Sequence, residues 1–88
     1  MKKLLIKIDS LETVNAICAV CMKYRGEFEV DIYCGRYCVD GISVIGVTSM
    51  LGREVNVVPI TDDDNLIGIF INDMKEIGAY EREEEVWK

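Results

Sequence analysis

The stretch EFEVDIYCGRYCVDGISVIGV, residues 27–47, decides the fold. Acidic and apolar side chains alternate over residues 27–32, and this period of two is typical of a strand with one buried and one solvated face. Gly35 tolerates a positive φ, so Cys34-Gly35 predicts a two-residue hairpin turn into a second strand that ends near Asp40. In this register the apolar side chains of both strands share a side, with Ile32 opposite Tyr37 and Val30 opposite Val39.

A short helix and a further strand are expected directly after this hairpin. Ser43 has the side chain of a helix N-cap, and Gly52 marks the end of the helix that it starts. Glu54 to Ile60 is rich in valine and predicts a strand. Pro59 lacks an amide donor, so it implies that this strand lies at an edge or ends there.

The chain on either side of this middle region adds one strand and two longer helices. Residues 3–8 alternate like a strand, and residues 10–24 carry a helical apolar stripe: Leu11, Val14, Ile17, Cys18 and Cys21. Carboxylates within residues 61–65 are a start signal for a last helix that fades at Gly78. Residues 79–88 are mostly acidic and are expected to form a solvated tail that includes Trp87.

The predicted order is β-α-β-β-α-β-α, which belongs to the α+β class. Split β-α-β units of this kind give a four-stranded antiparallel sheet with the three helices on one face. We expect one domain over residues 1–78, followed by the acidic tail over residues 79–88. The core should contain five sheet residues packed against the first and last helices: Leu4, Ile6, Val30, Ile32 and Val39.

The amino-acid composition argues against several classes of function. The chain has 88 residues, with 10 basic and 16 acidic side chains, so the positive surface that nucleic-acid binding requires is not expected. It has no histidine, which removes the commonest general base and any phosphohistidine chemistry. No apolar stretch is long enough to span a bilayer and no export signal is recognisable, so we expect a cytoplasmic protein without membrane contact.

The segment from Gly35 to Val47 resembles the region around the regulatory serine of the histidine-containing phosphocarrier protein family, HPr. In that family a glycine turn, a strand and a serine-led helix start follow one another in the same order. Ser43, Val44, Ile45, Gly46 and Val47 match the serine, the two apolar residues, the glycine and the next apolar residue. The resemblance spans roughly residues 1–77 and implies an open-faced β-sandwich from the phosphoenolpyruvate-dependent sugar phosphotransferase system.

The phosphocarrier site of the family is missing from this chain. In the family, a histidine followed by alanine, arginine and proline begins the first helix, whereas this chain reads Asp9-Ser10-Leu11-Glu12-Thr13. A phosphoramidate cannot form without imidazole, and Glu12 lies where an anion would need positive charge. We therefore expect no catalytic residue and no cofactor, and predict a non-enzymatic, regulatory or protein-binding module.

Ser43 matches the serine that a dedicated kinase phosphorylates from ATP in Gram-positive members, which turns HPr into a partner of a transcriptional regulator. An N-cap position favours an added phosphate, because free amides and the helix dipole stabilise its charge. The alternative is that Ser43 only caps the helix, since Ile42 replaces the lysine of the family and Asp40 would repel a phosphate. HPr kinase or a transcriptional regulator is the partner that the resemblance implies.

In the family the short helix contributes to the surface that partner proteins contact. The apolar stripe of Val44, Ile45, Val47, Met50 and Leu51 is expected to be partly core, and any exposed member is a candidate for contact. The residues selected as the candidate partner surface are Val44, Val47, Met50 and Leu51.

The four cysteines leave a second interpretation open, a metal or redox sensor. Cys18 and Cys21 lie on the apolar stripe of a helix, where cysteine packs as a small apolar residue, and not in a zinc knuckle or at a helix start. Cys34 lies at the expected hairpin tip, and Cys38 points away from Val39. These positions do not predict a shared metal site, and without an export signal the cysteines should remain thiols.

Overall fold

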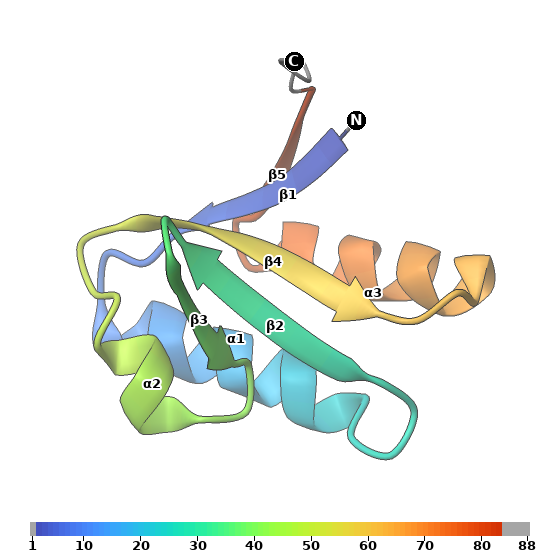
Figure 1. The fold of residues 1–88 in the computed structure, drawn as a ribbon, viewed down its shortest axis with the longest axis horizontal. Helices are drawn as coiled ribbons and strands as arrows, with labels where there is room; N and C mark the ends of the chain where they lie inside the picture. The colour runs from blue at the N-terminus through green and yellow to red at the C-terminus, as the bar shows by residue number, and fades with distance from the viewer. Residues whose placement is uncertain (1, 84–88) are drawn as a thin grey trace.

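The computed structural model describes residues 2–83, which form three helices and one five-stranded antiparallel sheet (Figure 1). The elements are, in order, β1 (Lys2–Lys7), α1 (Leu11–Lys23), β2 (Glu29–Cys34), β3 (Tyr37–Asp40), α2 (Val44–Thr48), β4 (Glu54–Ile60), α3 (Asp64–Glu76) and β5 (Tyr80–Glu83). The strand order across the sheet is β3-β2-β4-β1-β5. The predicted α+β class is confirmed.

The predicted number of strands is wrong, because the sheet has five and not four. The additional strand, β5, lies in the segment expected to be an acidic tail, and it pairs with β1 from Leu5↔Tyr80 to Lys2↔Glu83. Charged side chains are common on edge strands, because they discourage pairing with a further strand. One of them, Glu81, lies on the helix side of β5 and forms a salt bridge of 2.7 Å with Lys75 of α3. Residues 84–88, with Trp87, lie outside the described residues.

The hairpin turn is displaced from its predicted position. Cys34 pairs with Tyr37 and Ile32 with Val39, so the turn consists of Gly35 and Arg36 and not of Cys34 and Gly35. Gly35 has a φ of +61°, whereas Arg36 does not have a positive φ; a positive φ at the first central residue alone, with glycine there, is the pattern of a type II′ turn. The displacement changes the pairing by two residues, so every side chain keeps its predicted face.

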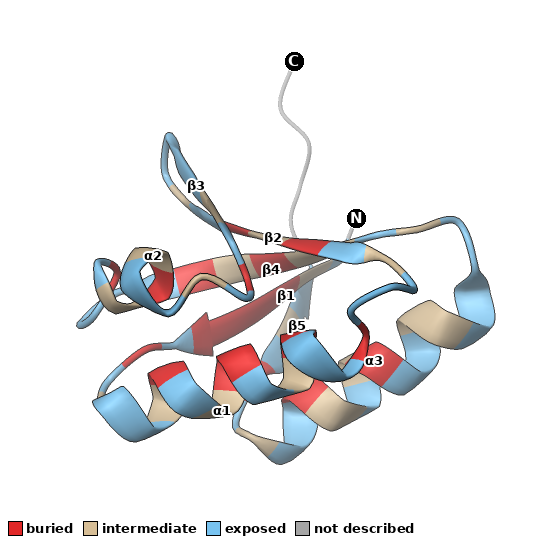
Figure 2. Cartoon of the chain, turned by 90° about the horizontal axis from the view of Figure 1, so that it is seen from below, coloured by how far each residue is buried: buried red, intermediate tan, exposed pale blue. Residues whose placement is uncertain are grey.

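The core lies between the sheet and the helices. Figure 2 shows α1 and α3 under one face of the sheet, with α2 close to β3. The predicted sheet residues Leu4, Ile6, Val30 and Ile32 are buried there, and Val39 is half-buried against them. The helices contribute their own buried stripes, Val14, Ile17, Cys18 and Cys21 from α1 and Phe70 and Met74 from α3.

Both long helices begin at side-chain caps, and the cap of α3 lies within residues 61–65, where the start signal was predicted. Ser10 is the N-cap of α1 and its Oγ accepts from the amide of Thr13 at 3.2 Å. Asp63 is the N-cap of α3 and its Oδ1 accepts from the amides of Asn65 and Leu66. No helix within residues 2–83 is both long enough and apolar enough to cross a membrane.

A buried aromatic cluster ties the end of α1 to α3. The ring of Phe70 meets those of Tyr24 and Phe28 edge-on, with centroids 5.5 and 5.6 Å apart. The Tyr24 hydroxyl donates to Asp73 Oδ2 at 2.5 Å, and Lys23 pairs with the same oxygen at 2.9 Å. Burial, followed by this hydrogen bond and the charge of Asp73, raises the pKa of Tyr24 to about 12.

The sheet face opposite the helices carries no helix of residues 2–83 and looks toward the viewer in Figure 1; we call it the open face. By strand alternation and register, its side chains are those of Lys3, Leu5, Lys7, Glu29, Asp31, Tyr33, Cys38, Asp40, Glu54, Asn56, Val58, Ile60, Tyr80 and Arg82. Leu5 is nevertheless only 4% exposed. Tyr80, which pairs with Leu5, extends across β1 on this face, and its hydroxyl contacts the Glu54 carboxylate.

Candidate functional site

Ser43 is the N-cap of α2, as predicted. Its Oγ accepts from the amide of Gly46 at 3.2 Å, and its own amide donates to the carbonyl of Asp40 at 3.0 Å. The Asp40 carboxylate in turn accepts from the amide of Ile42 at 3.0 Å. Asp40 therefore shapes the turn that presents Ser43, and its negative charge lies within this same turn.

Two glycines allow this turn to pack closely on the rest of the protein. A Cβ on Gly41 would lie 2.6 Å from Cys21 Sγ and 3.3 Å from Val30 Cβ. A Cβ on Gly46 would lie 3.0 Å from Val39 Cβ. A side chain at residue 41 would force a neighbour to shift and one at residue 46 would be tight, so the two glycines let this turn and α2 approach α1 and β3 closely.

The four residues predicted to form a partner surface divide into two pairs. Val44 and Leu51 are exposed, at 50% and 46% of their surface. Val47 and Met50 are buried in the core at 0% and 3%, so they are unavailable to a partner and that part of the prediction is wrong. Val47 is the buried residue of α2 itself, and Met50 follows the helix in the turn after it.

Two other apolar residues are exposed beside Ser43: Ile45, which belongs to the predicted stripe, and Ile42, which the sequence did not single out. Ile45 is 86% exposed and Ile42 is 39% exposed. A helical wheel centred on Val47 would have placed Ile45 outside, because it lies two residues away and so points to another side of the helix. We call Ile42, Val44, Ile45 and Leu51 together the α2 patch.

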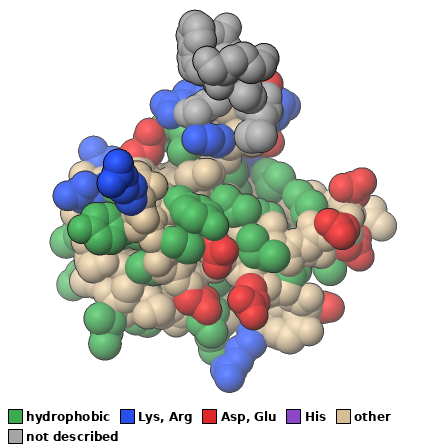
Figure 3. All heavy atoms as spheres, viewed as in Figure 1, with side chains coloured by type: hydrophobic (Ala, Val, Ile, Leu, Met, Phe, Trp, Pro, Cys, Tyr) green, Lys and Arg blue, Asp and Glu red, His purple; other side chains and the backbone are tan. Residues whose placement is uncertain are grey.

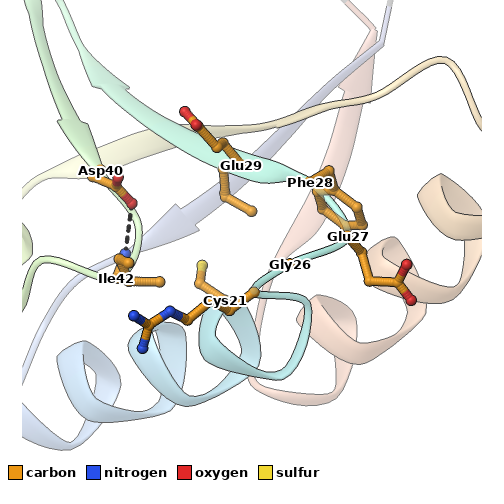
Figure 4. A pocket seen from close by; sticks show the side chains of 9 residues that line it. Cys21, Gly26, Glu27, Phe28, Glu29, Asp40 and Ile42 are labelled. Atoms are coloured by element: carbon orange, nitrogen blue, oxygen red, sulfur yellow. Dashed lines mark hydrogen bonds between the residues drawn. The ribbon is translucent and has the colours of Figure 1, made fainter.

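A cavity of about 410 Å³ lies next to this turn, between the end of α1, the start of β2 and Asp40 (Figure 4). Three carboxylates line it, those of Glu27, Glu29 and Asp40, together with the guanidinium of Arg25. Its walls are otherwise apolar and include Cys21, Phe28 and Ile42. The excess of negative charge does not suit an anionic ligand.

The start of α1 is where the phosphocarrier site of the HPr family would lie. An open hollow of about 640 Å³ is present there, lined by Asp9, Ser10, Glu12, Thr13, Ala16 and Ile77. Ser10 is engaged in capping, and Asp9 Oδ1 accepts from the Thr13 hydroxyl at 2.9 Å. With two carboxylates and no basic residue in its lining, this hollow repels phosphate.

The four cysteines do not come together. Cys18 and Cys21 are buried, and burial raises both pKa values, that of Cys21 to about 12 with smaller contributions from Cys18 and Asp40. Cys34 is half-buried on the helix side of the hairpin, whereas Cys38 is exposed on the open face opposite Tyr33. Within residues 2–83, no cluster of three or more His, Cys, Asp or Glu side chains is placed to hold a metal ion.

Comparison of the whole chain with protein-family models and with curated protein sequences finds no match.

Proposed function

We propose that this protein is an HPr-like binding module that has lost phosphocarrier chemistry and contacts other proteins through the α2 patch. The observation that carries the proposal is the exposure of four apolar side chains around one five-residue helix, with Ile45 exposed over 86% of its surface. Exposed apolar groups that gather on one rigid element are typical of a protein contact.

The residues at the start of α1 support the loss of the carrier role. The chain holds no histidine, and the hollow at this position is lined by Asp9 and Glu12. Ser10 does not replace the missing imidazole, because its hydroxyl caps the helix and a serine phosphate ester is too stable to pass its phosphate onward. Protein binding therefore fits the chain better than phosphate transfer.

Phosphorylation of Ser43 is the regulatory part of this proposal. The hydroxyl lies at the first turn of α2, where the Gly46 amide already points at it, so an added phosphate finds a donor. Asp40 opposes the new charge, because its carboxylate lies within the same turn. A phosphate here would convert the apolar α2 patch into one with a charged rim.

The contact surface can be tested without nucleotide. Isotope-labelled protein is titrated with purified HPr kinase, and amide shifts are compared for Ile45→Asp and for Ile69→Asp, which alters an exposed isoleucine on α3. We expect shifts around α2 in the native chain, at least a tenfold loss of affinity for Ile45→Asp, and no loss for Ile69→Asp. Equal effects of the two variants, or shifts confined to other surfaces, would refute the assignment of the α2 patch.

Phosphorylation is tested separately by intact mass after incubation with HPr kinase and ATP. One phosphate is expected on the native chain and on Ser49→Ala, but none on Ser43→Ala. A parallel reaction with phosphoenolpyruvate and the upstream phosphotransferase should add nothing. Phosphate from phosphoenolpyruvate would overturn the loss of the carrier role, and no phosphate from ATP would remove the regulatory part of the proposal.

A further inference from the structure

A separate cavity lies beside the tip of the β2–β3 hairpin. It has a volume of about 320 Å³ and is enclosed by the hairpin on one side and by the end of α2 and the loop after it on the other. Most of its lining side chains are apolar, and the charge among them is the guanidinium of Arg53. We call it the hairpin cavity, and its lining residues are Cys34, Tyr37, Val39, Ser49, Met50 and Arg53.

Two arginines at this end of the molecule have no partner of opposite charge within residues 2–83. Arg53 lines the cavity and Arg36 lies in the β2–β3 turn, and neither guanidinium forms an ion pair there. Glu54 follows Arg53 in the chain, but its carboxylate pairs with Arg82 at 3.6 Å on the open face. Figure 3 shows basic side chains gathered where Figure 1 has the β2–β3 turn, although the chain carries a net charge of −6.

Tyr37 gives the hairpin cavity an exposed aromatic wall. Its side chain is on the helix side of the hairpin, as is that of its pairing partner Cys34, yet it is 74% exposed. Its hydroxyl forms no hydrogen bond within the described residues. Tyrosine and arginine are the residue types that, with tryptophan, contribute most to the affinity of protein contacts. The composition of this site is therefore that of a recognition site.

Ser49 adds a hydrogen-bond acceptor to the cavity. Its hydroxyl donates its proton to the carbonyl of Gly46 at 2.5 Å, so the oxygen can still accept but has no second proton to donate. A bound molecule can satisfy it with an N–H group. The site thus combines an apolar hollow, two unpaired cations and an acceptor.

We propose that the hairpin cavity binds a peptide segment of another protein in which an apolar side chain is flanked by acidic residues. The apolar side chain enters the cavity against Tyr37 and Met50, and the carboxylates pair with Arg36 and Arg53. A peptide amide donates to the oxygen of Ser49. This site is separate from the α2 patch and does not depend on the resemblance to HPr.

The chemistry of the site selects a peptide over a free small carboxylate. A peptide supplies the apolar group, more than one carboxylate and the N–H donor together, whereas a small carboxylate supplies one charge and no N–H. The volume lies at the lower end of the range of about 300–1,000 Å³ typical of ligand sites, which suits an inserted side chain better than a larger molecule. A cationic segment would meet repulsion from both arginines.

A titration with short peptides tests the proposal on the full chain. The probe is the blocked peptide acetyl-Asp-Glu-Phe-Glu-Asp-amide, added to isotope-labelled protein. We expect amide shifts at the lining residues and a dissociation constant of about 100 µM, because the contact is far smaller than the about 800 Å² per partner of a stable interface. Lysine in place of the four acidic residues, or alanine in place of phenylalanine, should weaken binding by about tenfold or more, as should replacing the peptide with free 3-phenylpropionate.

Two variants and two matched controls assign the contact to this cavity. Arg53→Glu and Tyr37→Ser should each weaken binding of the acidic peptide by about fivefold or more. Arg25→Glu makes the same charge change at an exposed residue just after α1, and Tyr33→Ser makes the same change on the opposite face of the hairpin. Both controls should bind as the native chain does, and circular dichroism confirms that all four variants are folded.

Four results would overturn the proposal: no shift at the hairpin cavity, equal binding of the lysine peptide, equal binding of 3-phenylpropionate, or equal weakening by Arg53→Glu and Arg25→Glu. Each is independent of the titration with HPr kinase, which reports on the α2 patch. The hairpin cavity can therefore fail while the proposed function stands, and the reverse.

Discussion

Replacing Gly41 by alanine should destabilise the protein through steric overlap alone. Gly41 is buried, and its φ is not among the positive values, so alanine can adopt its backbone conformation. The new Cβ would lie 2.6 Å from Cys21 Sγ, about 1 Å inside ordinary van der Waals contact. The Cβ atoms of Cys21 and Val30, both at 3.3 Å, cannot rotate away because they are fixed by the backbone.

The expected loss is about 1–3 kcal/mol, the usual effect of an added methyl group in a packed core. With a urea dependence of about 1 kcal/mol per M, the midpoint of unfolding should fall by about 1–3 M, measured by far-ultraviolet circular dichroism. Gly68→Ala is the matched control, because Gly68 lies within α3 and nothing is within 4 Å of its new Cβ. Helix propensity predicts that this variant gains about 0.5–1 kcal/mol.

A double variant identifies the overlapping atom. Cys21→Ala alone removes a buried sulfur and should cost about 1 kcal/mol, but it also vacates the position that the Cβ at residue 41 would meet. The double variant should therefore be more stable than the sum of the single effects predicts, by about 1–2 kcal/mol. Strict additivity, or a stabilising effect of Gly41→Ala, would show that the close contact between α1 and the turn before Ser43 does not exist.

Three further changes test other contacts. Phe70→Ala should cost about 3–5 kcal/mol, because this fully buried ring is the centre of the aromatic cluster; thermal unfolding reports it, and a loss below about 1 kcal/mol would contradict the packing. Asp63→Ala should cost about 0.5–2 kcal/mol by removing the cap of α3, whereas Asp62→Ala should have little effect in the same assay. Tyr24→Phe should cost about 1 kcal/mol at neutral pH through loss of the bond to Asp73. Because the pKa of Tyr24 is raised to about 12 from an ordinary value near 10, its contribution is complete below pH 10 and is lost as the pH rises toward 12. Urea titrations from pH 8 to pH 12 should thus show a shallower decline for Tyr24→Phe than for the native chain, and parallel declines would refute the assignment.

Sequence reasoning succeeded where apolar periodicity and capping residues agree. The stripe on residues 10–24, the strand from Glu54 to Ile60, the cap Ser43 and the start signal within residues 61–65 are local patterns that tertiary packing reinforces. The same reasoning missed β5, since Tyr80–Glu83 has one aromatic and three charged residues and resembles a solvated tail. Its stability comes from pairing with β1, nearly the whole chain away, and no local pattern reports such a contact.

The candidate site was predicted less completely than the fold. The position of Ser43 at a helix start follows from its own side chain, but the split between buried Val47 and Met50 and exposed Val44 and Leu51 depends on how α2 is rotated against the core. The hairpin turn has the same limitation, because Gly35 can serve in either of two adjacent two-residue turns. The structure also reveals the hairpin cavity, which depends on how the β2–β3 hairpin packs against the end of α2.

The place of β1 in the sheet bears on how the protein is made. β1 begins at residue 2, yet its two neighbours are β4, which ends at residue 60, and β5, which ends at residue 83. Only the hairpin of β2 and β3 forms from residues close in the chain, whereas β1 has no partner until β4 has been made. Folding during synthesis should therefore pause at a hairpin with helices until β4 is released and joins β1 to β2, and β5 should add to the edge of the sheet last.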